Sequence, residues 1–163
     1  MKPLPTLFLD RDGVLNVRPP GYVTTPAEWI PLPGLEEAMQ QLSTVFGRIV
    51  VVTNQAGIGK GLMTEADLAA VHQKMLDTIR SAGGRIDAIY YCPHRREEGC
   101  DCRKPATGMG LRAKVDFPDI DFTNSWIAGD SASDMEFGFR LGMKTVLIHG
   151  KTEEADQLAQ MPV

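Results

Sequence analysis

The sequence predicts an α/β fold, a three-layer sandwich in which a central parallel sheet carries helices on both faces. Short runs of apolar and β-branched residues alternate along the chain with longer segments whose apolar residues recur at helical spacing. This alternation of strand and helix is typical of parallel sheets with right-handed crossovers. The segments between the elements are too short for a helical cap domain, so we expect a Rossmann-like fold with no large cap.

Residues 7–9 form the first apolar run and predict a buried strand, which ends at Asp10 and Asp12 with Gly13 directly behind them. The carboxyl end of such a strand is where α/β proteins usually place ligands. Burial of an unpaired carboxylate is costly or forces its protonation, so the pair needs a cation or a proton-transfer role. A plain surface turn is the alternative, since Asp and Gly are common turn residues.

Residues 17–33 contain five prolines and little periodicity, and they predict a long loop. A loop of this length inside a domain is uncommon unless it covers a site. Its aromatic side chains, Tyr22 and Trp29, either form the wall of a pocket or anchor the loop on the core.

The other elements are predicted from periodicity and from signals at helix ends. Thr64, with Asp67 three residues later, is an N-terminal capping signal, and Gly83 and Gly84 mark the end of the same helix. The predicted helices span residues 34–46, 64–82, 108–115 and 132–141, the predicted strands 49–52, 86–91, 125–128 and 144–148, a glycine-rich loop 54–61, and a polar helical tail 151–163.

Polar residues follow four of the predicted strands, and we expect them to meet because the carboxyl ends of parallel strands open on one edge of a sheet. Three carboxylates, a hydroxyl and a lysine are the groups needed for Mg²⁺-dependent phosphoryl transfer, with oxygen ligands for the ion and donors for a phosphate. The residues concerned are Asp10, Asp12, Thr53, Asn54, Lys104, Asp130 and Asp134.

All three cysteines, Cys92, Cys100 and Cys102, fall within eleven residues, and His94 lies between them. An odd number of clustered cysteines suits a metal site in a reducing compartment better than disulfides. Three thiolates and an imidazole form a tetrahedral set for Zn²⁺, and four protein ligands leave no open position for catalysis. We therefore predict a structural zinc loop at about residues 92–104; buried cysteines beside a surface histidine are the alternative.

Composition limits the class of protein. With 163 residues, 43% of them hydrophobic and 23% charged, the chain is predicted to form one globular domain over residues 1–163. The net charge of −4 argues against general binding to nucleic acid or to an anionic membrane. No long apolar run opens the chain, so we expect neither a signal peptide nor a transmembrane helix, a cytoplasmic location and, by default, a monomer.

The polar segments at the strand ends resemble the four motifs of the haloacid dehalogenase superfamily of phosphatases. The segments are DRDG at residues 10–13, TN at 53–54, RKP at 103–105 and GDSASD at 129–134, so the resemblance spans nearly the whole chain. For Asp134 three roles stay open: it orients Lys104, caps the helix that follows, or binds the metal directly.

This resemblance implies a role for each motif residue. Asp10 would be the nucleophile that forms an aspartyl-phosphate, and Asp12 the general acid for the leaving group and then the base for water. Thr53 and Lys104 would hold phosphate oxygens. Mg²⁺ would be bound by Asp10, by the backbone carbonyl of Asp12 and by Asp130.

The CPH and CDCRKP segments narrow the resemblance to a zinc-bearing branch, subfamily IIIA, which includes heptose-bisphosphate phosphatases and histidinol-phosphatases. The loop TNQAGIGKG is more similar to the heptose enzymes and implies removal of the 7-phosphate of D-glycero-D-manno-heptose 1,7-bisphosphate. In that case Asn54, Lys60 and Arg103 would bind the substrate, the last two through the uncleaved phosphate. A histidinol-phosphate phosphatase is one alternative, and a non-catalytic phosphate-binding module is the alternative from another class.

Overall fold

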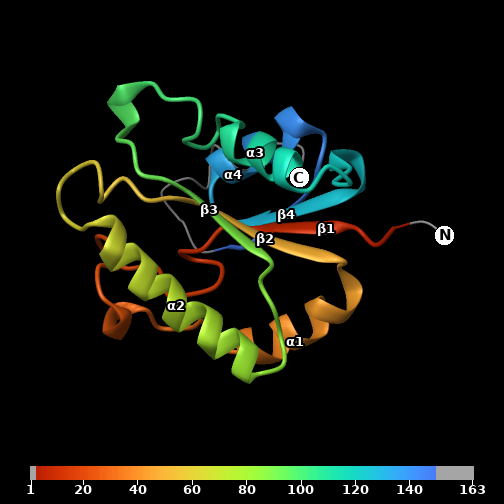
Figure 1. Ribbon diagram of the computed structural model, residues 1–163, viewed down its shortest axis with the longest axis horizontal. Helices are drawn as coiled ribbons and strands as arrows, with labels where there is room; N and C mark the ends of the chain where they lie inside the picture. The colour runs from red at the N-terminus through yellow and green to blue at the C-terminus, as the bar shows by residue number, and fades with distance from the viewer. Residues whose placement is uncertain (1–2, 150–163) are drawn as a thin grey trace.

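A five-stranded parallel sheet forms the centre of the computed structural model, which describes residues 3–149 (Figure 1). The polar tail predicted at residues 151–163 lies outside the described residues. The strands are β1 (Thr6–Leu9), β2 (Arg48–Asn54), β3 (Ala88–Cys92), β4 (Ser125–Gly129) and β5 (Lys144–Leu147). The helices are α1 (Leu35–Val45), α2 (Glu65–Ser81), α3 (Gly108–Asp116) and α4 (Ala132–Leu141). The strand order is β3-β2-β1-β4-β5, so β1 is central.

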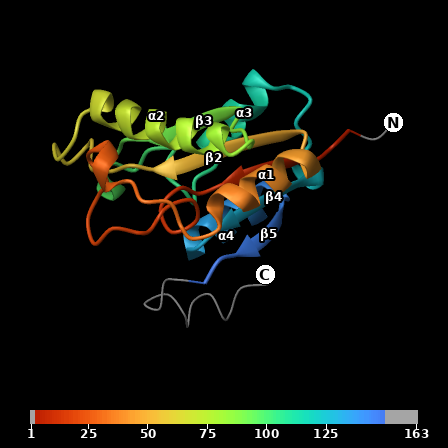
Figure 2. The ribbon, with the colours of Figure 1, turned by 90° about the horizontal axis from the view of Figure 1, so that it is seen from below.

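Two hydrophobic cores lie on opposite faces of this sheet. Along β1, Leu7 and Leu9 belong to one core and Phe8 to the other, as the two-residue period of a strand requires. The first core includes Met75 of α2 and the second includes Phe137 of α4. Figure 1 shows α1 and α2 on one side of the sheet and α3 and α4 on the other, and Figure 2 views the sheet from the side of α1 and α2. The predicted three-layer sandwich is therefore confirmed.

Local capping explains where two of the helices begin. Thr64 Oγ1 accepts a hydrogen bond from the N–H of Asp67, and the carboxylate of Asp67 accepts one from the N–H of Thr64. Ser131 and Asp134 form the same reciprocal box at the start of α4. These boxes satisfy N–H groups that a helix leaves unpaired at its first turn. The second box also fixes the direction in which α4 leaves the edge of the sheet.

The predicted loop at residues 17–33 contains a single 3₁₀ turn, Pro26–Glu28. Trp29 is fully buried in the core, and Lys74 of α2 donates hydrogen bonds to the carbonyls of Pro26 (2.8 Å) and Trp29 (3.0 Å). Tyr22 lines a cavity instead. Trp29 therefore anchors the loop on the core, whereas Tyr22 forms part of the wall of a cavity.

The element boundaries differ from the predicted ones by a few residues. β3 begins at Ala88 rather than at residue 86, because Asp87 still pairs with Ile49 through its backbone N–H and its carboxylate (both 2.8 Å) before the ladder starts. β2 continues through Asn54, which carries two polar residues to the tip of the sheet. Within residues 3–149 no helix has the length and apolar character needed to cross a membrane.

Candidate active site

A cavity of about 660 Å³ opens at the edge of the sheet where the parallel strands end. β1 ends immediately before Asp10 and β4 immediately before Asp130. The N–H of Asp10 donates to the carbonyl of Ala128 (3.1 Å), which continues the pairing of β1 with β4 and fixes the first carboxylate. The predicted site residues that line the cavity are Asp10, Asp12, Thr53, Asn54, Arg103, Lys104 and Asp134.

Lys104 is the centre of a buried ionic group. Its Nζ lies 3.0 Å from Asp10 Oδ1 and 2.6 Å from Asp134 Oδ1, and it donates a third hydrogen bond to the carbonyl of Val52 (2.7 Å). Burial disfavours the ammonium charge, but the two carboxylates outweigh this and raise the pKa of Lys104 to about 12. Lys104 is therefore a fixed positive charge beside Asp10.

The same neighbours act differently on the two carboxylates. Burial, followed by repulsion from Asp134, raises the pKa of Asp10 to about 8, although Lys104 opposes the change. Burial also disfavours the charge of Asp134, but Lys104 and a hydrogen bond from Ser131 lower the pKa of this carboxyl group. Asp134 thus holds the negative charge that pairs with Lys104, and Asp10 is a carboxylate in need of a further cation.

Asp134 combines two of the three roles that its sequence position left open. Its Oδ1 orients Lys104, while its Oδ2 accepts hydrogen bonds from the N–H of Asp130 (3.1 Å), the N–H of Ser131 (3.2 Å) and the hydroxyl of Ser131 (2.9 Å). Both oxygens are therefore engaged in positioning Lys104 and in capping α4.

Asp12 lines the same cavity and belongs to a second group of contacts. Its Oδ1 accepts hydrogen bonds from Arg11 Nε (2.9 Å) and from Asn16 Nδ2 (3.0 Å). Arg11 is completely buried, and its second contact is His72 Nε2, 3.2 Å from Nη1. The buried guanidinium of Arg11 thus fixes the Asp12 carboxylate, and His72 in turn contacts Arg11.

We expect His72 to make the protein sensitive to acid. Burial and the charge of Arg11 lower the pKa of His72 to about 3, so between pH 6.5 and 3 the unfolded chain binds a proton that the folded protein does not. Stability therefore rises with pH through this window and is lost as the pH falls. Urea unfolding is measured for wild type and for His72→Gln, which keeps a hydrogen-bond acceptor. From pH 6.5 to pH 5 the free energy of unfolding of wild type should fall by about 2 kcal/mol more than that of His72→Gln. His149 is exposed, so His149→Gln is the control and should lose as much stability as wild type. An equal fall in the free energy of unfolding for His72→Gln and wild type would contradict this account.

Thr53 and Asn54 reach the cavity from the end of β2. Thr53 Oγ1 accepts a hydrogen bond from Gln55 Nε2 (2.9 Å). The Asn54 amide pairs with the main chain of Lys104, since Oδ1 accepts from its N–H (3.0 Å) and Nδ2 donates to its carbonyl (3.2 Å). The described contacts of Asn54 thus hold Lys104 at the site, and direct substrate binding by Asn54 stays a prediction.

Oxygen atoms suited to a hard cation gather beside Asp10. The carboxylates of Asp10, Asp130 and Asp134 place oxygens within 4.8 Å of one another, and carboxylate and carbonyl oxygens are the ligands that Mg²⁺ prefers. Gly13 adopts a left-handed φ of 85°, and a Cβ atom there would stand 2.0 Å from Asp130 Oδ2. Any side chain at residue 13 would displace the Asp130 carboxylate, so a glycine is needed to keep its oxygens near those of Asp10. The residues present therefore fit a magnesium ion.

Arg18, on the loop at residues 17–33, is a site residue that the sequence analysis missed. Its guanidinium contacts both oxygens of Asp130, with Nε 2.9 Å from Oδ2 and Nη2 2.7 Å from either oxygen. Nη2 also donates to the backbone carbonyl of Asp12 (3.0 Å). The one available signal was that Arg18 is the sole basic residue of that loop.

The two basic residues predicted to bind a second phosphate differ in position. Arg103 lines the cavity, as does Arg96, which was not predicted. Lys60 is exposed and is not among the lining residues; its Nζ lies 5.2 Å from the centroid of the Tyr22 ring, which does line the cavity. A role of Lys60 in substrate binding stays a prediction.

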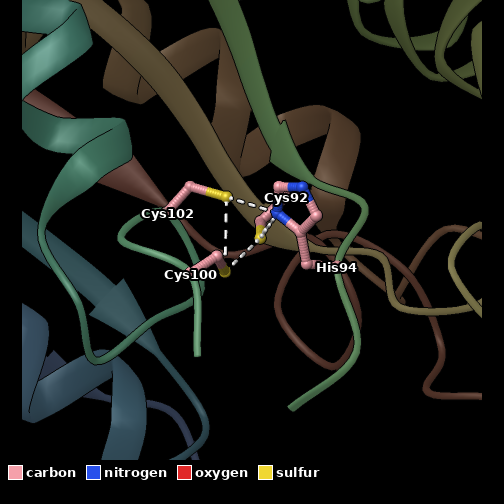
Figure 3. Close-up of side chains that lie close together, drawn as sticks. All are labelled: Cys92, His94, Cys100 and Cys102. Atoms are coloured by element: carbon pink, nitrogen blue, oxygen red, sulfur yellow. Dashed lines mark hydrogen bonds between the residues drawn. The ribbon is translucent and has the colours of Figure 1, made fainter. Parts of the chain in front are cut away.

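The cysteine cluster has the dimensions of a tetrahedral zinc site. Figure 3 shows the four side chains pointing toward one another at the end of β3 and the loop that follows it. Cys92 Sγ lies 3.5 Å from both Cys100 Sγ and His94 Nδ1, and Cys102 Sγ lies 3.7 Å from Cys100 Sγ and 3.1 Å from the same nitrogen. Ligands about 2.3 Å from a central zinc would be about 3.8 Å apart. The spacing agrees with one ion bound at the centre.

Burial and hydrogen bonding affect these thiols differently. Burial raises the pKa of Cys92, whereas N–H groups of Arg103 and Cys102 outweigh burial and lower the pKa of Cys100 to about 7. Cys92 and Cys102 also belong to the hydrophobic core beneath α3. The loop that delivers Lys104 to the cavity is thus attached to the core through two of the four possible ligands.

Comparison with known proteins gives relatives over most of the chain. A family model described as HAD-hydrolase-like matches residues 101–163. The chain is 43% identical over 148 residues to the D-glycero-beta-D-manno-heptose-1,7-bisphosphate 7-phosphatase of Pseudomonas putida, a match that covers 90% of this chain and 84% of that protein. It is 40% identical over 142 residues to the enzyme of the same name from Pseudomonas aeruginosa, covering 87% of this chain and 79% of that one.

Solved structures give the same result. The crystal structure of D,D-heptose 1,7-bisphosphate phosphatase from B. bronchiseptica, complexed with magnesium and phosphate, matches with a TM-score of 0.88 and 36% identity. The match covers 98% of this chain and 88% of that one. With sequence relatives at 40% and 43% identity, a matching fold and a carboxylate–lysine site at the expected strand ends, the chain belongs to the haloacid dehalogenase-like family of hydrolases and is a phosphatase.

Proposed function

We propose that this phosphatase is a Mg²⁺-dependent phosphomonoesterase that removes the 7-phosphate of D-glycero-D-manno-heptose 1,7-bisphosphate through an aspartyl-phosphate on Asp10. The observation that carries the proposal is the contact between Asp10 and the buried ammonium of Lys104 in a cavity lined by arginines. The names of the relatives and the magnesium and phosphate in the B. bronchiseptica structure support it.

In the first step, a carboxylate oxygen of Asp10 attacks phosphorus, and the bond between phosphorus and the ester oxygen breaks. Lys104, 3.0 Å from Asp10, offsets the charge of the incoming phosphate, to which the Thr53 hydroxyl at the cavity wall can also donate. Asp12 faces the same cavity and gives its proton to the leaving alkoxide.

In the second step, water attacks the phosphorus of the aspartyl-phosphate. Asp12, now ionised, accepts the proton of that water, and the bond between phosphorus and the Asp10 oxygen breaks. Inorganic phosphate leaves, and both carboxyl groups return to their starting states. Arg11 and Asn16 hold Asp12 in one orientation for the two proton transfers.

The magnesium ligands in this proposal are the carboxylates of Asp10 and Asp130 and the backbone carbonyl of Asp12. When bound, the ion would supply positive charge for the phosphate and for the nucleophile. Asp10 has its pKa raised by burial and by neighbouring carboxylates, so it is the group that gains most from an additional cation.

The substrate class follows from the charge around the cavity. Arg103 and Arg96 line it in addition to Lys104, so a second anionic group on the substrate would meet a guanidinium. No large cap covers the cavity within the described residues, which leaves selectivity to the loop at residues 17–33 and to the zinc loop. A small sugar bisphosphate satisfies both conditions.

Phosphate release from a substrate panel tests this function. The panel contains both anomers of heptose 1,7-bisphosphate, histidinol phosphate, fructose 1,6-bisphosphate and an aryl phosphate, each with Mg²⁺ and in magnesium-free buffer. We expect a magnesium-dependent preference for a heptose bisphosphate. A preference for histidinol phosphate would assign that substrate to the enzyme and leave the proposed catalytic residues unchanged. No phosphate release from any substrate would favour a non-catalytic phosphate-binding module.

We also propose that Cys92, His94, Cys100 and Cys102 bind one structural Zn²⁺. Cys102→Ser is expected to lower the zinc content from about one ion per chain to well below one, and to reduce thermal stability. Elemental analysis and thermal unfolding check this, and added Mg²⁺ should not reverse the loss. Asp101→Asn, on the same loop but outside the ligand set, is the control and should keep its zinc; full zinc content in Cys102→Ser would contradict the assignment.

A further inference from the structure

The guanidinium of Arg18 lies among atoms that the proposed function gives to magnesium. It contacts both carboxylate oxygens of Asp130 at 2.7 Å and the backbone carbonyl of Asp12 at 3.0 Å. Two of the three proposed metal-binding groups are therefore occupied by a side-chain cation. Burial opposes the charge of Arg18, but the hydrogen bond and charge of Asp130 outweigh it and raise the pKa of the guanidinium.

Arg18 uses a lone pair of each of these three oxygen atoms and holds the oxygens facing its guanidinium group. Mg²⁺ binds oxygens at about 2.0–2.1 Å and demands near-octahedral geometry, so its ligands must turn their lone pairs toward one centre. Arg18 would also repel a divalent cation seated on the same carboxylate. Arg18 in this position and a magnesium ion therefore compete for Asp130.

We infer that Arg18 is an internal competitor for the magnesium site, which leaves Asp130 when the ion binds and then becomes a phosphate-binding residue of the cavity. The inference rests on the proposed function, because it takes Asp130 and Asp12 as magnesium ligands. It adds a specific residue, on a loop outside the family motifs, to the binding of both the metal and the substrate.

The charges that line the cavity indicate which group Arg18 contacts after it leaves Asp130. Within the part of the chain that the structure describes, each acidic side chain that lines the cavity already contacts a cationic side chain. The pairs are Asp10 and Asp134 with Lys104, Asp12 with Arg11, and Glu136 with Arg140. The Arg18 side chain is 38% exposed and itself lines the cavity, so it has room to turn there. The anion that then needs a partner is the phosphate of the substrate.

Calorimetric titration with Mg²⁺ tests the competition directly. Wild type, Arg18→Met and Arg140→Met are compared after dialysis into metal-free buffer, without a chelator because it would also remove zinc. Arg140 lines the same cavity but pairs with Glu136, so its variant controls for the loss of one positive charge. We expect Arg18→Met to bind Mg²⁺ about tenfold more tightly than wild type and Arg140→Met to change little. Equal or weaker binding by Arg18→Met would overturn the inference.

Two further measurements follow the guanidinium itself. In nitrogen-15 NMR spectra of wild type, the Arg18 Nε–H signal, identified by its absence from the Arg18→Met spectrum, should shift as Mg²⁺ is added. With Mg²⁺ saturating, Arg18→Met should bind inorganic phosphate several-fold more weakly than wild type. An unmoved Nε–H signal or an unchanged phosphate affinity would overturn the proposed exchange.

These outcomes separate the inference from the function on which it rests. If wild type binds no Mg²⁺ and hydrolyses no substrate of the panel, the proposed function fails and the inference fails with it. If wild type binds Mg²⁺ and hydrolyses a substrate while Arg18→Met has the same magnesium affinity, only the inference about Arg18 fails.

Discussion

Replacement of Lys104 by Met is expected to destabilise the protein by about 3–5 kcal/mol and to lower kcat/KM by about 10³-fold or more. Lys104 is 3% exposed and pairs with two buried carboxylates, so its removal leaves Asp10 and Asp134 close together without a counter-charge. The variant also loses the hydrogen bond to the carbonyl of Val52, which ties the zinc loop to β2. On the proposed mechanism, the variant that is still folded also loses activity, because Lys104 offsets the charge of the phosphate.

A double-mutant cycle with Asp134→Asn distinguishes the two contributions. Asp134→Asn keeps Lys104 but removes the carboxylate that orients it, and the double variant lacks both charges. We expect the destabilisation of the double variant to be smaller than the sum of the single effects, since Lys104→Met leaves the buried Asp134 carboxylate without its counter-charge and Asp134→Asn removes that carboxylate. Urea unfolding measures the cycle, and kinetics are recorded only where the variants are folded. Additive stabilities, or a Lys104→Met variant as active as wild type, would contradict the assignment.

The strand ends could be located in the sequence because buried parallel strands are continuous apolar runs that end at polar residues. Asp10 and Asp130 stand directly after such runs, so their meeting at one edge follows from the parallel topology alone. The meeting of Cys92, His94, Cys100 and Cys102 was predictable in a similar way, since all four lie within eleven residues of the sequence. In each case a local pattern and a general rule of α/β folds were sufficient.

Contacts between distant segments could not be predicted in this way. Arg18 and Asp130 are 112 residues apart, and nothing near Arg18 in the sequence indicates a partner. The contact between the Asn54 amide and the main chain of Lys104 was not predicted for the same reason, because the two residues are 50 positions apart. The rotation of each side chain at the cavity depends on packing that periodicity does not encode.

Replacement of Asp10 by Asn is expected to lower phosphatase activity by about 10⁴-fold or more, because the amide cannot form the aspartyl-phosphate. The geometry around Lys104 should survive, since Asn has nearly the same shape and keeps an oxygen acceptor for the ammonium group. Activity is measured on freshly prepared protein whose mass is checked, so that deamidation back to Asp does not supply the residual rate. Activity near that of wild type would remove Asp10 from its role as nucleophile.

The same substitution is expected to preserve or increase stability in magnesium-free buffer. In wild type the pKa of Asp10 is raised from 3.8 to about 8, chiefly by burial and then by the charge of Asp134. Between these values the folded protein holds a proton that the unfolded chain releases, so the stability of wild type falls as the pH rises from about 4 to 8. Asn cannot ionise and is spared this loss.

The stability difference between Asp10→Asn and wild type should therefore grow with pH across that window, to at most about a few kcal/mol, and level off above pH 8. Urea unfolding of both proteins at pH 5, 7 and 8.5, without Mg²⁺, measures it, and other titrating groups largely cancel in the difference. A difference that shrinks with rising pH would mean that Asp10 is already a stable anion without metal. The expected result would instead mean that the folded protein disfavours the ionised form of Asp10 in the absence of metal, so that an incoming cation is what stabilises the ionised nucleophile.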